Sequence, residues 1–167
     1  CYRRALAADP GNATAQVNLA NAEAMSGRLD AAAARLAGAL EAEPDNILAL
    51  DSRARVMMAL GRLEQAETHW RQVLALTPRD AERHAQLGAV LAGLQRVDEA
   101  AAAFARATEL DPGSGEAWRQ LGIMLFLRQD LGSAADALRR ALGCDPDDTV
   151  ARRHLAMTLM ARGDNPA

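Results

Sequence analysis

The sequence predicts an all-α protein built from repeated pairs of helices. The first observation is a fixed period, since prolines recur every 34 residues at Pro10, Pro44, Pro78, Pro112 and Pro146. A regular period of this size is typical of repeat proteins. Second, apolar and small residues follow the i, i+3, i+4, i+7 spacing of an amphipathic helix twice in every period. Third, helix-capping residues stand at the same point of each period, which predicts where the helices begin.

The period divides the chain into units of one helix, A, followed by a second helix, B. We expect a single array made of a half unit at 1–12 (helix B only), full units at 13–46, 47–80, 81–114 and 115–148, and a half unit at 149–167 (helix A and a tail). The predicted A helices lie near 13–26, 47–60, 81–94, 115–128 and 149–162. The predicted B helices lie near 1–9, 30–43, 64–76, 98–110 and 132–143.

The residues at the helix ends support these boundaries. A short polar side chain that can accept a hydrogen bond from the first helical turn precedes each helix A, at Asn12, Asn46, Asp80, Ser114 and Asp148. Such a cap stabilises a helix by about 1 kcal/mol. Each proline disfavours helical geometry in the residue before it, which ends helix B. Glycines that can adopt the left-handed conformation lie between helices A and B or after the last helix A, at Gly27, Gly61 and Gly163.

Small and bulky residues alternate at set positions of the units. The eighth position of helix A is small, at Ala20, Ala54, Gly88, Gly122 and Ala156. The third position of helix B is alanine, at Ala32, Ala66, Ala100 and Ala134. A bulky residue stands four positions later, at Leu36, Trp70, Phe104 and Leu138, and at Tyr2 in the first half unit. This pattern resembles the tetratricopeptide repeat (TPR) family over essentially the whole chain. The resemblance implies a right-handed α-solenoid with Trp70 and Phe104 in the core.

The resemblance also implies a function. In such arrays the A helices line a concave face, so we expect a protein-interaction scaffold that binds a peptide or helix of a partner protein. The expected groove is more apolar in its C-terminal half, where arginines flank it. The candidate residues are Asn21, Met25, Arg55, Met58, Arg119, Ile123, Phe126, Leu127, Arg153, Met157 and Met160. As an alternative, a further helix of the same protein covers the C-terminal part.

One specific binding mode can be tested on the residues. TPR co-chaperones that bind acidic C-terminal peptides share a clamp of basic and asparagine side chains. The best frame of this sequence places Val17, Asn21, Ser52, Glu82 and Gln86 at the clamp positions. Only Asn21 fits, and Glu82 has the wrong charge. The sequence therefore argues against a clamp for chaperone tails.

Two charged residues stand where the family is usually apolar or bulky. They are Glu23 and Arg53, on neighbouring predicted A helices and on faces that should point inward. An unpaired charge in such a place would cost several kcal/mol. We therefore hypothesise that they form a semi-buried ion pair. The alternative is that both side chains reach solvent by extending along the surface.

Composition excludes several classes of function. The net charge is −3 and all 19 basic residues are arginine, so the chain lacks the basic surface of a nucleic-acid-binding protein and any lysine for Schiff-base or P-loop chemistry. No run of about 18 apolar residues exists that would cross a membrane. The high content of Ala and Arg suggests a bacterial origin. His69, His84 and His154 have no metal-ligand spacing, and no nucleophile–base pair stands out. We expect no catalytic residue, cofactor or metal.

Two other functions stay open. The chain begins CYRRAL, without an initiator methionine or signal peptide, so we expect a piece of a longer protein. Bacterial TPR arrays resemble those fused to glycosyltransferases, sulfotransferases or hydroxylases, and the chain could be the substrate-presenting arm of such an enzyme. The predicted half units at the two ends could also stack head to tail between chains and form a homo-oligomer. The cellular compartment stays open, with the cytoplasm favoured over the periplasm.

Overall fold

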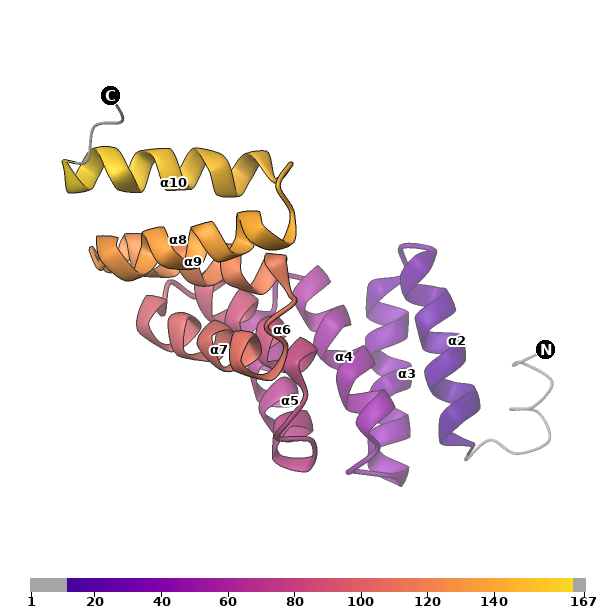
Figure 1. Cartoon of the computed structure of the whole chain (residues 1–167). Coiled ribbons are helices and arrows are strands. Elements are labelled where there is room, and N and C mark those ends of the chain that lie inside the picture. Colours follow the sequence, from indigo (N-terminus) through magenta and orange to yellow (C-terminus); the bar gives the residue numbers. More distant parts are fainter. Residues whose placement is uncertain (1–11, 164–167) are drawn as a thin grey trace. The chain divides into compact units, whose positions relative to one another are not determined.

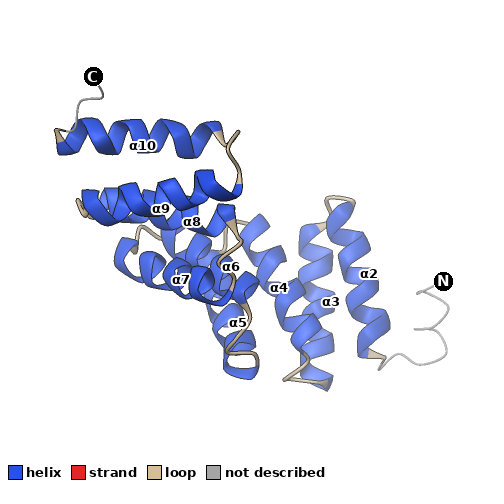
Figure 2. Ribbon diagram, viewed as in Figure 1, coloured by secondary structure: helices blue, strands red, loops and turns tan. Residues whose placement is uncertain are grey.

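The structure, a computed structural model, describes residues 12–163. In this range the chain forms α-helices joined by short turns, without strands (Figures 1 and 2). The all-α prediction is therefore confirmed for the described part of the chain. The expected helix near 1–9, with Tyr2, lies outside the described residues, as do residues 164–167. By contacts the chain divides into two compact units, residues 1–78 and 79–167.

The first unit contains two helix pairs. Its described helices are α2 (Ala13–Met25), α3 (Leu29–Ala42), α4 (Ile47–Ala59) and α5 (Leu63–Leu76). Each A helix packs against the B helix that follows it, α2 against α3 and α4 against α5. α4 also contacts both α3 and α2, so the two A helices of this unit are neighbours.

The second unit contains two helix pairs and a further A helix. Its described helices are α6 (Ala81–Gly93), α7 (Val97–Leu110), α8 (Gly115–Leu127), α9 (Leu131–Cys144) and α10 (Thr149–Arg162). α6 packs against α7 and α8 against α9, while α8 contacts α7 and α10 contacts both α9 and α8. The observed helices agree with the predicted ones to within one or two residues at each end. Division of the sequence into 34-residue repeats of one array stays a prediction.

All five predicted N-caps are confirmed. The distance from the capping oxygen to the amide nitrogen is 2.8 Å for Asn12 and Ala15, 3.0 Å for Asn46 and Ala49, and 3.1 Å for Asp80 and Arg83. Ser114 accepts from Ala117 at 3.2 Å, and Asp148 accepts from Val150 and Ala151 at 2.9 Å each. These bonds satisfy amide groups that have no partner inside the helix, and they therefore determine where each A helix begins.

The turns between helices A and B share one geometry, although their sequences differ. Gly27 and Gly61 have φ values of 78° and 72°, as predicted for glycine. The equivalent residues of the second unit are Gln95 (φ 60°) and Gln129 (φ 63°), which the sequence pattern did not identify. In each turn the amide after this residue donates to a carbonyl five positions earlier, as in Arg96 to Leu91 at 2.9 Å. This hydrogen bond closes the helix end in a Schellman motif.

The core forms where a small residue of helix A meets a bulky residue of helix B. Trp70 and Phe104 are 0% and 2% exposed, which confirms them as core residues. The ring of Phe104 lies so close to Gly88 that an added Cβ would be 3.0 Å from three ring carbons. A Cβ on Gly122 would be 2.6 Å from Cγ of Leu138. In these two helix pairs the backbones therefore approach closely only because this position is glycine.

The hypothesis of an ion pair between Glu23 and Arg53 was wrong about the partner. Glu23 on α2 is buried, and its carboxylate accepts two hydrogen bonds from Arg35 on α3, at 2.9 Å from Nε and 2.8 Å from Nη2. This bond raises the pKa of Arg35, while burial acts in the opposite direction and is outweighed. Glu23 is thus neutralised within its own helix pair. Nε of Arg53 is buried and has no hydrogen-bond partner within residues 12–163.

Candidate protein-interaction site

The first unit has a cavity of about 420 Å³ between its two A helices and the start of α3. It is lined by Asn21, Ala24, Met25, Leu29, Ser52, Arg55, Val56 and Ala59. Three of the candidate groove residues, Asn21, Met25 and Arg55, therefore lie together around one hollow. Met58, a fourth candidate on the same helix as Arg55, is 37% exposed but does not line this cavity.

The wall of this cavity is mainly apolar. Met25 is 90% exposed at the end of α2, and Leu29 follows it in the first turn of α3. Ala24 and Ala59 have short side chains, and they leave the space that forms the hollow. A methionine with several rotatable bonds can adapt its shape to a partner side chain. An exposed apolar surface of this kind is typical of a protein-binding site.

The polar part of the cavity is organised by a buried carboxylate. Asp51 on α4 is buried, does not line the cavity and forms an ion pair with Arg55, at 2.8 Å between Oδ2 and Nη2. Its other oxygen, Oδ1, accepts a long hydrogen bond from Nε1 of the buried Trp70, at 3.4 Å. The side chain of Asp51 is 5% exposed and that of Arg55 is 54% exposed. The anion is therefore buried, whereas the cation is exposed to solvent. Asp51 is not among the candidate groove residues, and its role depends on Trp70 of another helix.

The second unit has a different cavity, of about 290 Å³, between α6, the end of α7 and the start of α8. It is lined by Ala81, Glu82, Ala85, Gln86, Ala107, Asp111, Ser114, Glu116 and Ala117. None of the candidate groove residues lines it. Its carboxylates are engaged locally: Glu82 accepts from Arg83, and Asp111 accepts from the amide of Gly113.

The C-terminal candidates lie on α8 and α10, two A helices that contact each other. Ile123 and Phe126 are half-buried, whereas Leu127 is 54% exposed. On α10, Met157 is 44% and Met160 72% exposed, and Arg153 is exposed as well. These residues line neither of the two cavities described above. The exposed apolar side chains of these two helices are Leu127, Met157 and Met160, and together with Arg153 we call them the α8–α10 surface.

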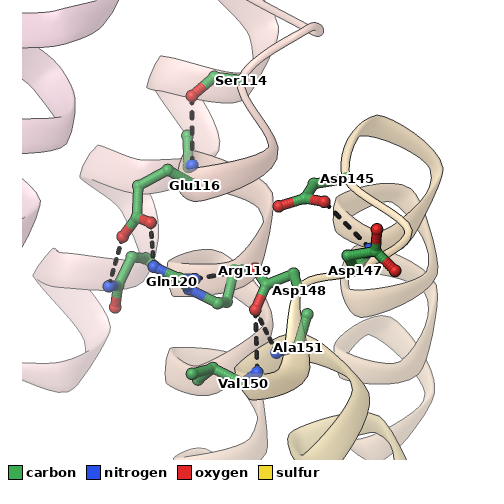
Figure 3. Close-up of polar contacts among 10 residues, drawn as sticks. Ser114, Glu116, Arg119, Gln120, Asp145, Asp147, Asp148, Val150 and Ala151 are labelled. Atoms are coloured by element: carbon green, nitrogen blue, oxygen red, sulfur yellow. Dashed lines mark hydrogen bonds and ion pairs between the residues drawn. The ribbon is translucent and has the colours of Figure 1, made fainter.

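Arg119 was expected at the rim of a groove, but the structure uses it to hold helices together. Its guanidinium binds Glu116 on its own helix and Asp148, the N-cap of α10, at 2.8 Å between Nη1 and Oδ2 (Figure 3). The hydrogen bond to Glu116 raises the pKa of Arg119 despite partial burial. Burial raises the pKa of Asp148, but the amide of Ala151 and the guanidinium of Arg119 outweigh it and leave that pKa lowered. Asp148 therefore connects α8 to the first turn of α10.

The histidines and the acidic residues of the described part of the chain show no arrangement for metal binding. Within residues 12–163, no group of three or more His, Cys, Asp or Glu side chains could hold a metal ion. Burial lowers the pKa of His69, with Arg53 contributing, although Gln72 opposes the shift by accepting a hydrogen bond. Burial also lowers the pKa of His154, and the nearby Arg153 and Arg119 act in the same direction. Among the described helices, none is long and apolar enough to cross a bilayer.

The family can be assigned by comparison with known sequences. One tetratricopeptide repeat profile matches residues 52–115 and 85–149, and a second matches residues 2–56. The chain belongs to the tetratricopeptide repeat family. No curated protein matches the chain.

Solved TPR structures share the fold at low sequence identity. YrrB, described as a TPR protein with an unusual peptide-binding site, is 22% identical with a TM-score of 0.88, over 99% of this chain and 85% of that protein. MamA from Desulfovibrio magneticus RS-1 is 19% identical with a TM-score of 0.82, over 89% and 84% of the two chains. PilF from Pseudomonas aeruginosa is 21% identical with a TM-score of 0.77, over 91% and 69%. The predicted all-α TPR repeat fold is therefore confirmed.

Proposed function

We propose that this TPR chain is a non-catalytic protein-interaction module that binds a segment of a partner protein on the face formed by its A helices. The observation that carries the proposal is the cavity of the first unit, where Asn21, Met25 and Arg55 converge from two A helices. Its volume of about 420 Å³ lies within the usual range for ligand pockets, roughly 300–1,000 Å³. The peptide-binding site that YrrB is described as having supports the same kind of function.

The α8–α10 surface is a second proposed contact area. Exposed Leu127, Met157 and Met160 present apolar side chains, and Arg153 provides a charged edge. Such a surface suits an amphipathic helix with apolar residues at i, i+3 and i+4. Substitution of Met157 and Met160 by aspartate should abolish binding at this surface without removing a core side chain. Equal recovery of partners by the wild type and this double variant would exclude the α8–α10 surface.

The proposal for the first unit can be tested with random peptides. The immobilised chain is used to select from a peptide library, and the affinity of enriched peptides is measured by fluorescence anisotropy. Ala59 is exposed and lines the cavity, so Ala59→Trp should fill it and weaken binding at least about tenfold. Ala34→Trp is the matched control, because Ala34 is an exposed alanine of α3 that does not line the cavity.

The two tryptophan variants distinguish the possible results. Loss of binding in Ala59→Trp, with normal binding in Ala34→Trp and equal thermal stability, supports the cavity as the binding site. Equal affinity of both variants and the wild type would exclude it. Two other functions have separate tests. A catalytic domain beside the array in the full-length protein would favour a substrate-presenting arm, and concentration-dependent oligomers in light scattering would favour head-to-tail assembly.

A further inference from the structure

We propose that the cavity of the first unit selects a partner segment in which an acidic residue lies beside a large apolar one, and that Asp51 is a positioning residue for this selection. The carboxylate of the partner is held by Arg55, and Asp51 orients Arg55 from behind. This inference rests on the proposed binding function of the same cavity and adds the chemistry of the segment that binds.

The lining of the cavity defines the apolar part of the segment. Met25, Leu29 and Val56, with two alanines, surround a hollow that is larger than one side chain. Burial of a Leu, Ile, Phe or Met side chain there would contribute about 1.5–3 kcal/mol. Because the hollow is open and apolar, this contribution favours a bulky side chain without selecting one type.

The charge of the lining defines the acidic part. Arg55 is the one charged side chain among the residues that line this cavity in the described chain. The anion with which it pairs, Asp51, is buried, whereas Arg55 itself is more than half exposed. The charged group that lines the cavity is therefore a cation. A guanidinium has five N–H donors, so its contact with Asp51 leaves donors for a second carboxylate.

An arginine with two carboxylates already occurs in this chain. Arg119 binds Glu116, three residues earlier on its own helix, and Asp148 from a neighbouring A helix. Arg55 likewise binds Asp51, four residues earlier on its own helix. In the first unit the second carboxylate would come from the partner. The guanidinium suits this geometry because its planar fork can contact two acceptors at fixed angles.

Asp51 is held in place by the core. The side chain of Asp51 is 5% exposed, and its carboxylate accepts a hydrogen bond from Nε1–H of Trp70, whose side chain is fully buried. A buried acceptor on a rigid helix pair holds the Arg55 side chain in one orientation. The arginine therefore loses little rotamer freedom when a ligand binds. Removal of the Asp51 charge should therefore weaken recognition of the partner carboxylate more than recognition of the apolar side chain.

The test starts from random-peptide selection against the wild-type chain. Enriched peptides should contain Asp or Glu next to Leu, Ile, Met or Phe. One such peptide is then compared with its Asn or Gln analogue. The acidic form should bind the wild type about tenfold more tightly, as expected for one charge-assisted contact. Arg55→Gln should remove this preference, and Arg55→Lys should remove most of it, because an ammonium lacks the planar fork.

Two further variants separate a positioning role from a structural one. Asp51→Asn should lower the affinity for the acidic peptide and leave that for the amide peptide nearly unchanged. Arg71→Gln is the matched control, since Arg71 is an exposed arginine paired with Glu67 four residues earlier, outside the cavity. It should leave the acid-to-amide ratio unchanged. Arg55→Lys and Arg55→Gln test the acidic preference of the cavity whether or not Asp51→Asn folds, and failure of Asp51→Asn to fold would show that Asp51 has a structural role rather than a positioning one.

The results distinguish this inference from the function on which it rests. If no peptide is enriched, or if enriched peptides bind equally to Ala59→Trp, the proposed site and the inference both fail. If peptides bind in the cavity but show no acidic preference, or if Arg55→Gln weakens the acidic and amide peptides equally, the site stands and the inference is overturned. An equal effect of Asp51→Asn on both peptides would remove Asp51 as a positioning residue.

Discussion

The two units use arginine on their A helices in different ways. In the first unit, Arg55 binds one carboxylate of its own helix and borders a cavity. In the second, Arg119 binds a carboxylate of its own helix and another from α10, and it lines neither cavity. Asp148, the N-cap of α10, makes Arg119 part of the scaffold of the second unit, whereas the side chain of Arg55 is 54% exposed beside the cavity of the first unit.

The units also differ at the small position where helices A and B meet. The first unit has Ala20 and Ala54, both fully buried, whereas the second has Gly88 and Gly122. The glycines are in contact with Phe104 and Leu138, with no room for a methyl group. In the second unit the backbone of helix A therefore approaches a bulky side chain of helix B without space for a methyl group at this position.

Truncation of the large core residue should have the largest effect in either unit. Trp70→Ala and Phe104→Ala should each lower the free energy of unfolding by about 3–5 kcal/mol, because each leaves a cavity between two helices. Urea unfolding followed by circular dichroism measures this loss. Trp118→Ala is the comparison, since Trp118 is only partly buried. Its indole N–H donates a hydrogen bond to the carbonyl of Pro112, and the guanidinium of Arg140 lies over its ring. A loss for Trp118→Ala as large as for Trp70→Ala would contradict this ranking.

Removal of the scaffold arginine should have the next largest effect. Arg119→Gln leaves the largely buried carboxylate of Asp148 without its charged partner, and we expect a loss of about 1.5–3 kcal/mol in unfolding free energy. Arg62→Gln breaks an exposed pair with Asp30 and should cost less than about 1 kcal/mol. Hydrogen exchange of α10 gives a local measure of the same loss. Unchanged protection of α10 in Arg119→Gln would show that Asp148 does not need this contact.

Replacement of a glycine by alanine should lower the free energy of unfolding at Gly122 in the second unit and raise it at Gly38 in the first. Gly122→Ala places a methyl group against Leu138, and we expect a net loss of about 1–2 kcal/mol from overpacking. Gly38 in α3 has its nearest neighbour, Oε1 of Gln16, at 3.7 Å from an added Cβ, which is an ordinary contact. Gly38→Ala should therefore gain up to about 1 kcal/mol from helix propensity. Thermal unfolding measures both effects. Unfolding temperatures that shift in the same direction in the two variants would argue against the close approach at Gly122.

The smallest expected effect is a loss of stability in mild acid. The folded pKa values of His69 and His154 lie below the ordinary value of 6.5, so the unfolded chain binds protons first as the pH falls. Stability should therefore decrease as the pH falls from about 6.5 through the folded values. The contribution of Asp148, whose pKa is lowered, is lost only below about 4. Thermal unfolding of His69→Leu and His154→Leu should show a weaker dependence on pH in this window than the wild type.

Most of the fold could be predicted from the sequence because its signals are local. Asn46 accepts from Ala49, three residues away, and this pairing depends only on the first turn of the helix. Such local signals recur every 34 residues, and they predicted every described helix to within one or two residues at each end. The left-handed Gln95 and Gln129 were missed, because glutamine carries no preference for that conformation and the turn imposes it.

The candidate site could be predicted only in part. The spacing placed Asn21, Met25 and Arg55 on A helices, and the structure brings them together around one cavity. The spacing did not predict that Arg119 would form an ion pair with Asp148, which lies 29 residues further along the chain. Binding by any of these residues stays a prediction until partners are measured.

The amino-acid sequence alone determined the repeat period, the helix ends and the small and bulky positions of the core. These depend on backbone preferences and on side chains within a few residues of one another. Only the tertiary structure decided that Glu23 pairs with Arg35 and that Asp51 stands between Trp70 and Arg55. The physical reason is distance, because an ion pair or a cavity requires two helices to be placed within a few ångströms. A sequence pattern indicates which face a residue occupies, but the packing of the neighbouring helix determines what that residue meets.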